Sequence, residues 1–495
     1  MVKVPVGEWL PDQPTFMNPG ATVAKNVIPR ISSYSSFPTV SQFSDNALDA
    51  YCRGAIAGKD QSGNTFIYAG DTSQLYRLVS TSFSDASRSG TGSTAYALAT
   101  QDRWEFAQFG NTIVATQVTD NVQGTQVGSS TFSDLITSTL KPKAKHVGIV
   151  RDFVVLGNLV ESSNHPQRVR WSALDDATDF SANASTQSDF QDLVGNGGEI
   201  QRVVGGEYGI IFQEQSIWRM NYIGSPLFFE FDEFEQNRGC LEPGSVVKYG
   251  SFIFYLSDDG FYMLNGATGI SQPIGKNKVD STFFKDLDSG YLYRMSSAID
   301  PRNNLVCWTY PGEANSNGTP NKMLIYNWSV NKWALVELET EFIFRARTTG
   351  VTLEELDSIS SSIDSLAFSL DSPVWVGGSI ELGVFDSDSM FGYFTGTAMA
   401  GTVETTEIQF APDQRWITTG VRPYVDGGDV TTTVQIGTRR DHTQTASYGS
   451  ALSLNGIGEA PARTNARYQR FRINTSGPFD HIQGVEVRGR KAGRR

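Results

Sequence analysis

The chain has few of the residues on which disulfide frameworks, metal centres and many catalytic sites depend. It holds 3 cysteines and 4 histidines in 495 residues, and charged residues make up only 19%. Cys52, Cys240 and Cys307 are odd in number and far apart, with no CxxC pair, so we interpret them as buried, reduced thiols. No run approaches the roughly 18 consecutive apolar residues of a membrane span. The first residues also lack the apolar core of a secretory signal, so we expect a protein made and kept in the cytosol.

Motifs for common chemistries are also missing from the sequence. GxSxG, HExxH and GxxxxGK[ST] do not occur, and the glycine-rich GNGGE (195–199) does not lie between a strand and a helix. The Asp-rich loops at 257–261 and 385–391 offer oxygen ligands to calcium, but their spacing differs from that of a calcium loop and suits tight turns equally well. We therefore assign no catalytic, cofactor-binding or metal residue, and predict a protein that is not an enzyme.

What the sequence does contain is β structure. Glycine is abundant at 48 residues and aromatic residues reach 12%, which favours many short strands joined by tight turns. Pairs of apolar runs separated by Gly, Asn, Asp or Ser recur along the middle of the chain. The first run of each pair begins near residues 64, 111, 152, 209, 252, 304 and 373. Most spacings suit a four-stranded blade of about 40–50 residues, so we predict an irregular β-propeller of six or seven blades. A set of meanders without a closed ring remains the alternative.

One segment departs from this pattern. In residues 352–368, apolar side chains recur at helical spacing, namely Leu353, Leu356, Ile359, Ile363 and Leu366. Thr352 and Glu355 have the spacing of a capping box. We expect a helix inserted late in the propeller, either as a brace on a blade or as a contact to a neighbour.

The two ends of the chain differ from the middle. Residues 1–50 are rich in Pro, Asn and Ser with little periodicity, and we expect an extended N-terminal arm that lies on another surface. The propeller is assigned to residues 51–399. Residues 400–495 contain five strand-like runs and turns, which predict a C-terminal β-sandwich that ends in a basic tail; the runs are 403–410, 418–425, 431–439, 466–473 and 481–489.

Charge is distributed unevenly along the chain. The net charge is −13, yet residues 463–495 hold nine Arg or Lys against Asp480 and Glu486, which leaves a strongly acidic remainder. An acidic body disfavours tight binding to a polyanion. The basic end either docks on an acidic neighbouring subunit or contacts DNA. Its candidate contact residues are Arg488, Arg490, Lys491, Arg494 and Arg495.

Several stretches resemble tail-nozzle or tail-hub proteins of tailed bacteriophages. They include WLPDQPTFMNPGATVAKNVIPR (9–30), VRWSALDDATDF (169–180), GGEYGIIFQEQSIWRMNYIGSP (205–226), FDEFEQNRGCLEPGSVV (231–247) and PVWVGGSIELGVFD (373–386). The likeness runs over most of residues 5–490.

This resemblance implies a structural virion protein, assembled in the host cytoplasm. It implies a homo-oligomeric ring, a hexamer, below the portal and head–tail adaptor proteins. The ring would extend the channel for DNA ejection and provide docking sites for tail fibres or spikes. Double-stranded DNA would pass without sequence-specific contacts, and no small-molecule substrate or cofactor is implied.

A different class of function stays open at this point. Propellers also host glycosidases and sialidases, so a receptor-binding or glycan-cleaving tail component is the alternative. It predicts a concave pocket with several aromatic residues and two facing carboxylates. The sialidase-type Asp box is absent as such, and SDDGFYML (257–264) only approximates it.

Overall fold

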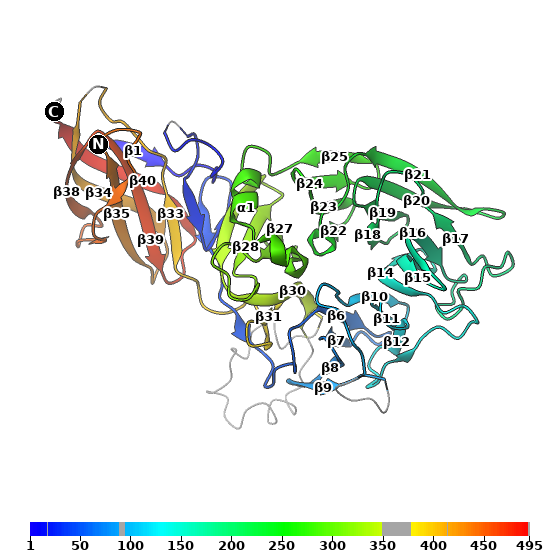
Figure 1. The fold of residues 1–495 in the computed structure, drawn as a ribbon. Coiled ribbons are helices and arrows are strands. Elements are labelled where there is room, and N and C mark those ends of the chain that lie inside the picture. The colour runs from blue at the N-terminus through cyan, green and yellow to red at the C-terminus, as the bar shows by residue number, and fades with distance from the viewer. Residues whose placement is uncertain (17, 89–94, 349–377, 413, 494–495) are drawn as a thin grey trace.

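The computed structural model of the chain describes residues 1–16, 18–88, 95–348, 378–412 and 414–493. The helix expected at 352–368 lies outside these residues, as do positions 373–377 of the strand expected at 373–378. Within them the chain forms a seven-bladed β-propeller joined to a β-sandwich (Figure 1). The prediction of an all-β propeller is confirmed, and the number of blades is seven.

Each blade is a four-stranded antiparallel sheet. The first strands of most neighbouring blades contact one another, including those of the last and first blades, so they are the innermost strands. Blade 1 consists of β6 (Gly54–Lys59), β7 (Thr65–Gly70), β8 (Leu75–Val79) and β9 (Ser82–Asp85), and blade 2 of β10 (Glu105–Phe109), β11 (Thr112–Thr116), β12 (Gln123–Gln126) and β13 (Ser133–Asp134). Blade 3 consists of β14 (Lys143–Val150), β15 (Phe153–Val160), β16 (Asn164–Trp171) and β17 (Asp189–Asp192), and blade 4 of β18 (Ile200–Val204), β19 (Gly209–Gln213), β20 (Ser216–Gly224) and β21 (Phe228–Gln236).

The last blade is completed by a strand from the other end of the sequence. Its outer strand is β5 (Ser41–Gln42), which pairs with β32, so the N-terminal segment closes the ring. Blade 5 consists of β22 (Val247–Tyr249), β23 (Phe252–Ser257), β24 (Gly260–Asn265) and β25 (Ile270–Pro273), and blade 6 of β26 (Ser296–Asp300), β27 (Leu305–Tyr310), β28 (Lys322–Asn327) and β29 (Lys332–Glu337). Blade 7 consists of β30 (Thr340–Arg347), β31 (Ile380–Asp386), β32 (Phe391–Tyr393) and β5. The helices α1 (Asp280–Asp286), η2 (Pro243–Ser245) and η3 (Ser289–Arg294) lie in connections around blades 5 and 6.

The second strand of each blade is the most apolar because both of its faces are covered by neighbouring blades. Every residue of β19 and β27 is buried. Between blades 5 and 6, the fully buried Trp308 and Trp333 stack with ring centroids 5.7 Å apart, and Phe261 packs on both. Their indole N–H groups donate to backbone carbonyls, so these large rings are buried without an unpaired polar group.

The C-terminal sandwich shares its strands with the N-terminal segment. One sheet has the order β3-β4-β40-β34-β38, with β1 also paired to β40; the other contains β33, β39 and β35 with β36 and β37 at its edge. The strands are β1 (Val2–Pro5), β2 (Val23–Lys25), β3 (Val27–Pro29), β4 (Tyr34–Ser36), β33 (Gly401–Glu404), β34 (Trp416–Asp426), β35 (Thr431–Arg439), β36 (Ser447–Tyr448), β37 (Leu452–Ser453), β38 (Ala460–Ala466), β39 (Tyr468–Ser476) and β40 (His481–Lys491). Apolar side chains from both sheets fill the space between them.

The N-terminal segment, expected as an extended arm, lies largely on this chain. Strand β2 pairs in parallel with β29 at Lys25 and Leu335, and antiparallel with β33 on its other side. One sheet therefore runs without a break from propeller blade 6 through β2 into the sandwich (Figure 1). The two domains are joined by backbone hydrogen bonds as well as by the covalent chain.

A buried carboxylate holds this junction. Glu404, on β33, is 1% exposed; it forms salt bridges with Arg472 at 2.7 Å and Arg470 at 3.2 Å, and accepts hydrogen bonds from the Tyr448 and Thr22 hydroxyls. The contact with Thr22 ties the segment that precedes β2 to the sandwich.

We predict that Glu404→Ala lowers the free energy of unfolding by about 3 kcal/mol, because it leaves two arginines without their counter-charge. This is the low end of the range for broken buried pairs, since the Arg472 side chain is 29% exposed and regains some hydration. Urea unfolding measures the change. The exposed Glu313→Ala variant is the control and is expected to stay within about 0.5 kcal/mol of wild type. Equal stability of the two variants would contradict the role given to Glu404.

Candidate functional site

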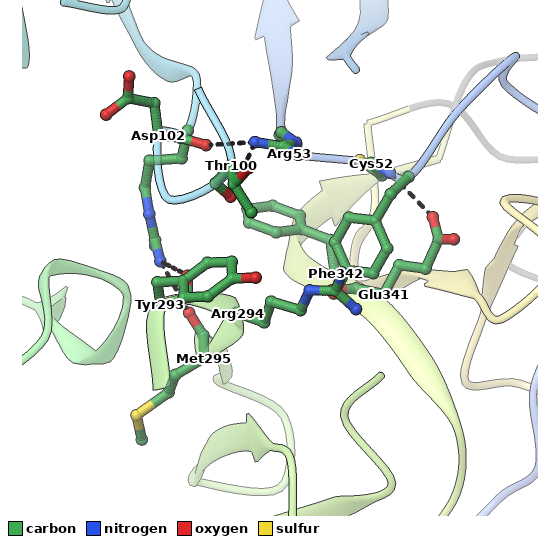
Figure 2. A pocket seen from close by; sticks show the side chains of 11 residues that line it. Cys52, Arg53, Thr100, Asp102, Tyr293, Arg294, Met295, Glu341 and Phe342 are labelled. Carbon is green, nitrogen blue, oxygen red and sulfur yellow. Dashed lines mark hydrogen bonds between the residues drawn. The ribbon is translucent and has the colours of Figure 1, made fainter. Parts of the chain in front are cut away.

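One end of the propeller axis gathers charged and aromatic side chains. Arg53 immediately precedes β6, and Arg103 lies two residues before β10. The last two residues of η3, just before β26, are Tyr293 and Arg294, and Glu341 lies in β30. These residues line a pocket between blades 1, 2, 6 and 7 (Figure 2). We call this region the axial mouth.

The arginines of the axial mouth bind the protein's own backbone. One guanidinium nitrogen of Arg53 donates to the carbonyls of Ala99, Thr100 and Asp102 at 2.6, 3.1 and 3.1 Å. Arg103 donates to the carbonyls of Tyr293 and Met295 at 2.7 and 3.1 Å, and forms a salt bridge with Glu242 at 2.7 Å. These two arginines therefore connect loops that belong to different blades.

A second charged cluster joins the innermost strands of blades 2, 3 and 4. Glu105, which is 3% exposed, pairs with Arg202 and lies 2.9 Å from Nδ1 of His146. Burial alone would raise the pKa of this carboxyl, but Arg202 and His146 outweigh burial and lower it to about 2. The cluster is an internally neutralised ion pair between blades 2, 3 and 4.

The two acids of the axial pocket do not face each other. Figure 2 shows the Asp102 and Glu341 side chains on opposite sides of the pocket, pointing apart. Glu341 accepts hydrogen bonds from the Cys52 backbone N–H at 2.8 Å and from the Ser389 hydroxyl at 2.9 Å. Burial raises the pKa of Glu341 to about 7. Its contacts place it as a link between blades 1 and 7.

The cavities along the axis are small. The pocket of Figure 2 has a volume of about 20 Å³, and the one beside Glu105 and Arg202 about 90 Å³. A third, lined by Lys145, His146 and Glu242, reaches about 190 Å³. A water molecule needs about 10–15 Å³, whereas small-molecule sites span about 300–1,000 Å³. Each of these three cavities is therefore smaller than a small-molecule site.

The basic residues predicted as contact sites lie at the far end of the molecule, on the sandwich. Arg488, Arg490 and Lys491 are exposed, but they belong to strand β40 and pair in register with β34, so this part of the basic end is a strand rather than a free tail. Arg488 lies 3.3 Å from Glu459. Arg494 and Arg495 are outside the described residues. The structure therefore does not bring the basic residues and the axial mouth together.

The Asp-rich loops serve as turns in the structure. One carboxylate oxygen of Asp386 accepts from the backbone N–H groups of Asp388 and Met390 at 2.9 and 3.0 Å. Asp259 accepts from the Tyr262 hydroxyl at 2.7 Å. In the part of the chain that the structure describes, no group of three or more His, Cys, Asp or Glu residues is placed to hold a metal ion.

Comparison with known proteins gives little beyond this geometry. No family model matches the chain, and no curated protein matches it. Solved structures that match include the extracellular domains of proteins named as a one-component system and a hybrid two-component system, both from B. thetaiotaomicron. Each is 10% identical to this chain, with a TM-score of 0.42. The matches cover 87% and 86% of this chain, but this chain spans only about half (48%) of the length of each matched structure. At these values the matches carry no argument about function. Among the described residues, no helix is both long and apolar enough to cross a membrane.

The pKa of Glu341 predicts a pH dependence of stability. The folded pKa of about 7 lies above the ordinary value of 4.5, so the folded state holds the proton more tightly than the unfolded state. This contribution is fully present below about pH 4.5 and is lost as pH rises through 7, by about 3 kcal/mol in all. Glu341→Gln removes it, so urea unfolding from pH 4.5 to 8.5 is expected to show a shallower decline than in wild type.

Glu105→Gln provides the contrast, because the folded pKa of Glu105, about 2, lies below the ordinary value of 4.5 and its effect on stability changes with pH in the opposite direction. Its contribution to stability is present above about pH 4.5 and is lost only as pH falls toward 2. Glu105→Gln should therefore reduce the loss of stability below about pH 4.5, which Glu341→Gln leaves in place. Parallel curves for wild type and Glu341→Gln would contradict the assignment.

Proposed function

We propose that this chain is a structural subunit of a tailed-bacteriophage virion. In this proposal several copies form a ring, a tail nozzle or hub with six subunits, below the portal and its adaptor. The ring extends the channel through which double-stranded DNA leaves, and tail fibres or spikes dock on it. The resemblance to such proteins over most of residues 5–490 suggests the role.

The observation that carries the proposal is the sheet that continues from blade 6 through β2 into the sandwich. Two domains joined by a continuous hydrogen-bonded sheet, with Glu404 neutralised at the junction, resist bending between them. A ring subunit under pressure from packaged DNA requires such stiffness. The strand β5, which closes the propeller, comes from the same N-terminal segment and extends this bracing to blade 7.

The axial mouth supports a channel between subunits rather than through one propeller. The axial cavities of about 20, 90 and 190 Å³ are too small to hold a duplex, and the Arg103–Glu242 and Arg202–Glu105 pairs cross the space between blades. DNA therefore has to pass through a lumen that several copies enclose. The net charge of −13 suits passage without firm phosphate contacts.

We predict that the purified full-length chain assembles into closed rings, seen as a single high-mass species by native mass spectrometry and as annular particles by electron microscopy. Rings of obligate subunits commonly bury more than about 2,000 Å² per interface, so the species should survive dilution to low micromolar concentration. A chain that stays monomeric at all concentrations and occurs in virions only as a peripheral single copy would contradict the proposal.

We also predict weak binding to DNA. Basic proteins bind duplex DNA non-specifically with dissociation constants of about 10⁻⁴ to 10⁻⁶ M at physiological salt. With a net charge of −13, this chain should bind a random duplex more weakly than that range in a filter-binding assay. Sequence-specific or micromolar binding would argue against a passive conduit.

A further inference from the structure

An open groove lies on the outer side of the propeller, between blades 3 and 4. Its volume is about 410 Å³, larger than each of the axial cavities. Trp171 and the strand β17 form one wall, and Trp218 with Phe229 and Phe231 forms the other. Trp171 packs on Phe229 at 5.0 Å between ring centroids, so the floor is aromatic. We call this feature the aromatic groove.

The rim of the aromatic groove carries several large apolar side chains that are exposed to solvent. Val194 and Leu227, which line it, are 74% and 68% exposed, and nearby Ile223 on β20 is 50% exposed. Contiguous exposed apolar surface of this kind typically marks a place where another molecule binds.

Carboxylates lie in and beside the groove: Asp189 and Asp192 line it, and Glu233 lies on the same face of β21 as the groove residue Phe231. Asp189 lies beside Trp171 in register, and Glu233 lies opposite Trp218, so both acids share the faces that carry the two tryptophans. Neither acid has a cationic partner within 4 Å among the described residues. Asp192, also at the rim, is neutralised by Arg168 at 2.7 Å but keeps 39% of its side chain exposed. A basic, partly apolar partner would complement this surface.

The chain itself presents such a partner on its sandwich. In register, Arg490 of β40 lies beside Ile417 of β34, and Ile417 lies beside Asn465 of β38. Arg463, two residues before Asn465, and Arg488, two residues before Arg490, therefore share the outward face of this sheet. All three arginines are exposed, and Arg463 and Arg490 have no ion-pair partner among the described residues. We call this surface the arginine face.

The aromatic groove and the arginine face lie at opposite ends of the molecule (Figure 1). One copy's arginine face therefore cannot reach its own groove, but it is free to reach that of a neighbour. A contact between two different surfaces of identical chains is heterologous, and it generates a ring when the rotation closes.

We infer that the aromatic groove of one copy receives the arginine face of the next copy, and that this contact builds the ring; the inference rests on the proposed function. Arginine suits both features of the groove, because its planar guanidinium stacks on aromatic rings and pairs with carboxylates. Trp and Arg are also the residues that contribute most to protein interfaces. The charge asymmetry of the sequence, with a basic end on an acidic body, is explained by this contact.

The test is a charge exchange on the full-length chain, with assembly followed by analytical ultracentrifugation. Arg463→Glu/Arg490→Glu and Asp189→Arg/Glu233→Arg should each raise the concentration needed for assembly at least about tenfold. The variant that carries all four substitutions restores opposite charges across the contact and should recover assembly to within about threefold of wild type. Unchanged thermal melting of each variant shows that folding is retained.

Matched controls use exposed charges elsewhere. Arg440→Glu on the sandwich and Glu313→Lys on the propeller should leave assembly unchanged. If wild type assembles and neither double variant weakens assembly, or if the combined variant fails to recover it, the inference is overturned while the ring remains. If wild type does not assemble at any concentration, the proposed ring fails, and the inference fails with it.

Discussion

The structure depends on the backbone pairing of the N-terminal segment, and above all on strand β2 between β29 and β33. This three-residue strand converts a blade of the propeller and a sheet of the sandwich into one sheet. On either side of it, β1, β3 and β4 complete the sandwich and β5 closes the propeller ring. Residues 1–42 thus supply strands to blade 7, to the sandwich and to the junction between the two domains. Stability and rigidity of both domains are coupled through them.

The sequence predicted the apolar parts of this fold well and the polar parts poorly. The runs taken as first strands, near residues 64, 111, 152, 209, 252 and 304, are the second strands of their blades. Those strands are buried on both faces and so have continuous apolar sequences. The innermost strands were missed because they face the axis, as GAIAGK of β6 shows. Strand β38, with Pro461 and Arg463, was missed for a similar reason, since it alternates between exposed and half-buried positions.

The candidate sites show the same limit. Positive charge at the C-terminal end was evident from composition, but only the register of β34, β38 and β40 shows which arginines share a face. The N-terminal strands lack periodicity because they are two to four residues long and pair with distant partners. Likewise, the ion pairs Arg103–Glu242 and Glu105–Arg202 join residues separated by about a hundred positions or more, which no local pattern indicates. Contacts between residues so far apart in sequence form only when the seven blades close into the propeller.

In the proposed assembly the conduit lies between copies of the chain, and each propeller axis stays closed. A reconstruction of the assembled particle by electron cryo-microscopy, at a resolution that places side chains, tests it most directly. The account predicts a pore enclosed by several subunits, with the Arg103–Glu242 and Glu105–Arg202 pairs intact within each propeller. A pore that runs along a single propeller axis, with these pairs broken and the blades spread apart, would contradict it.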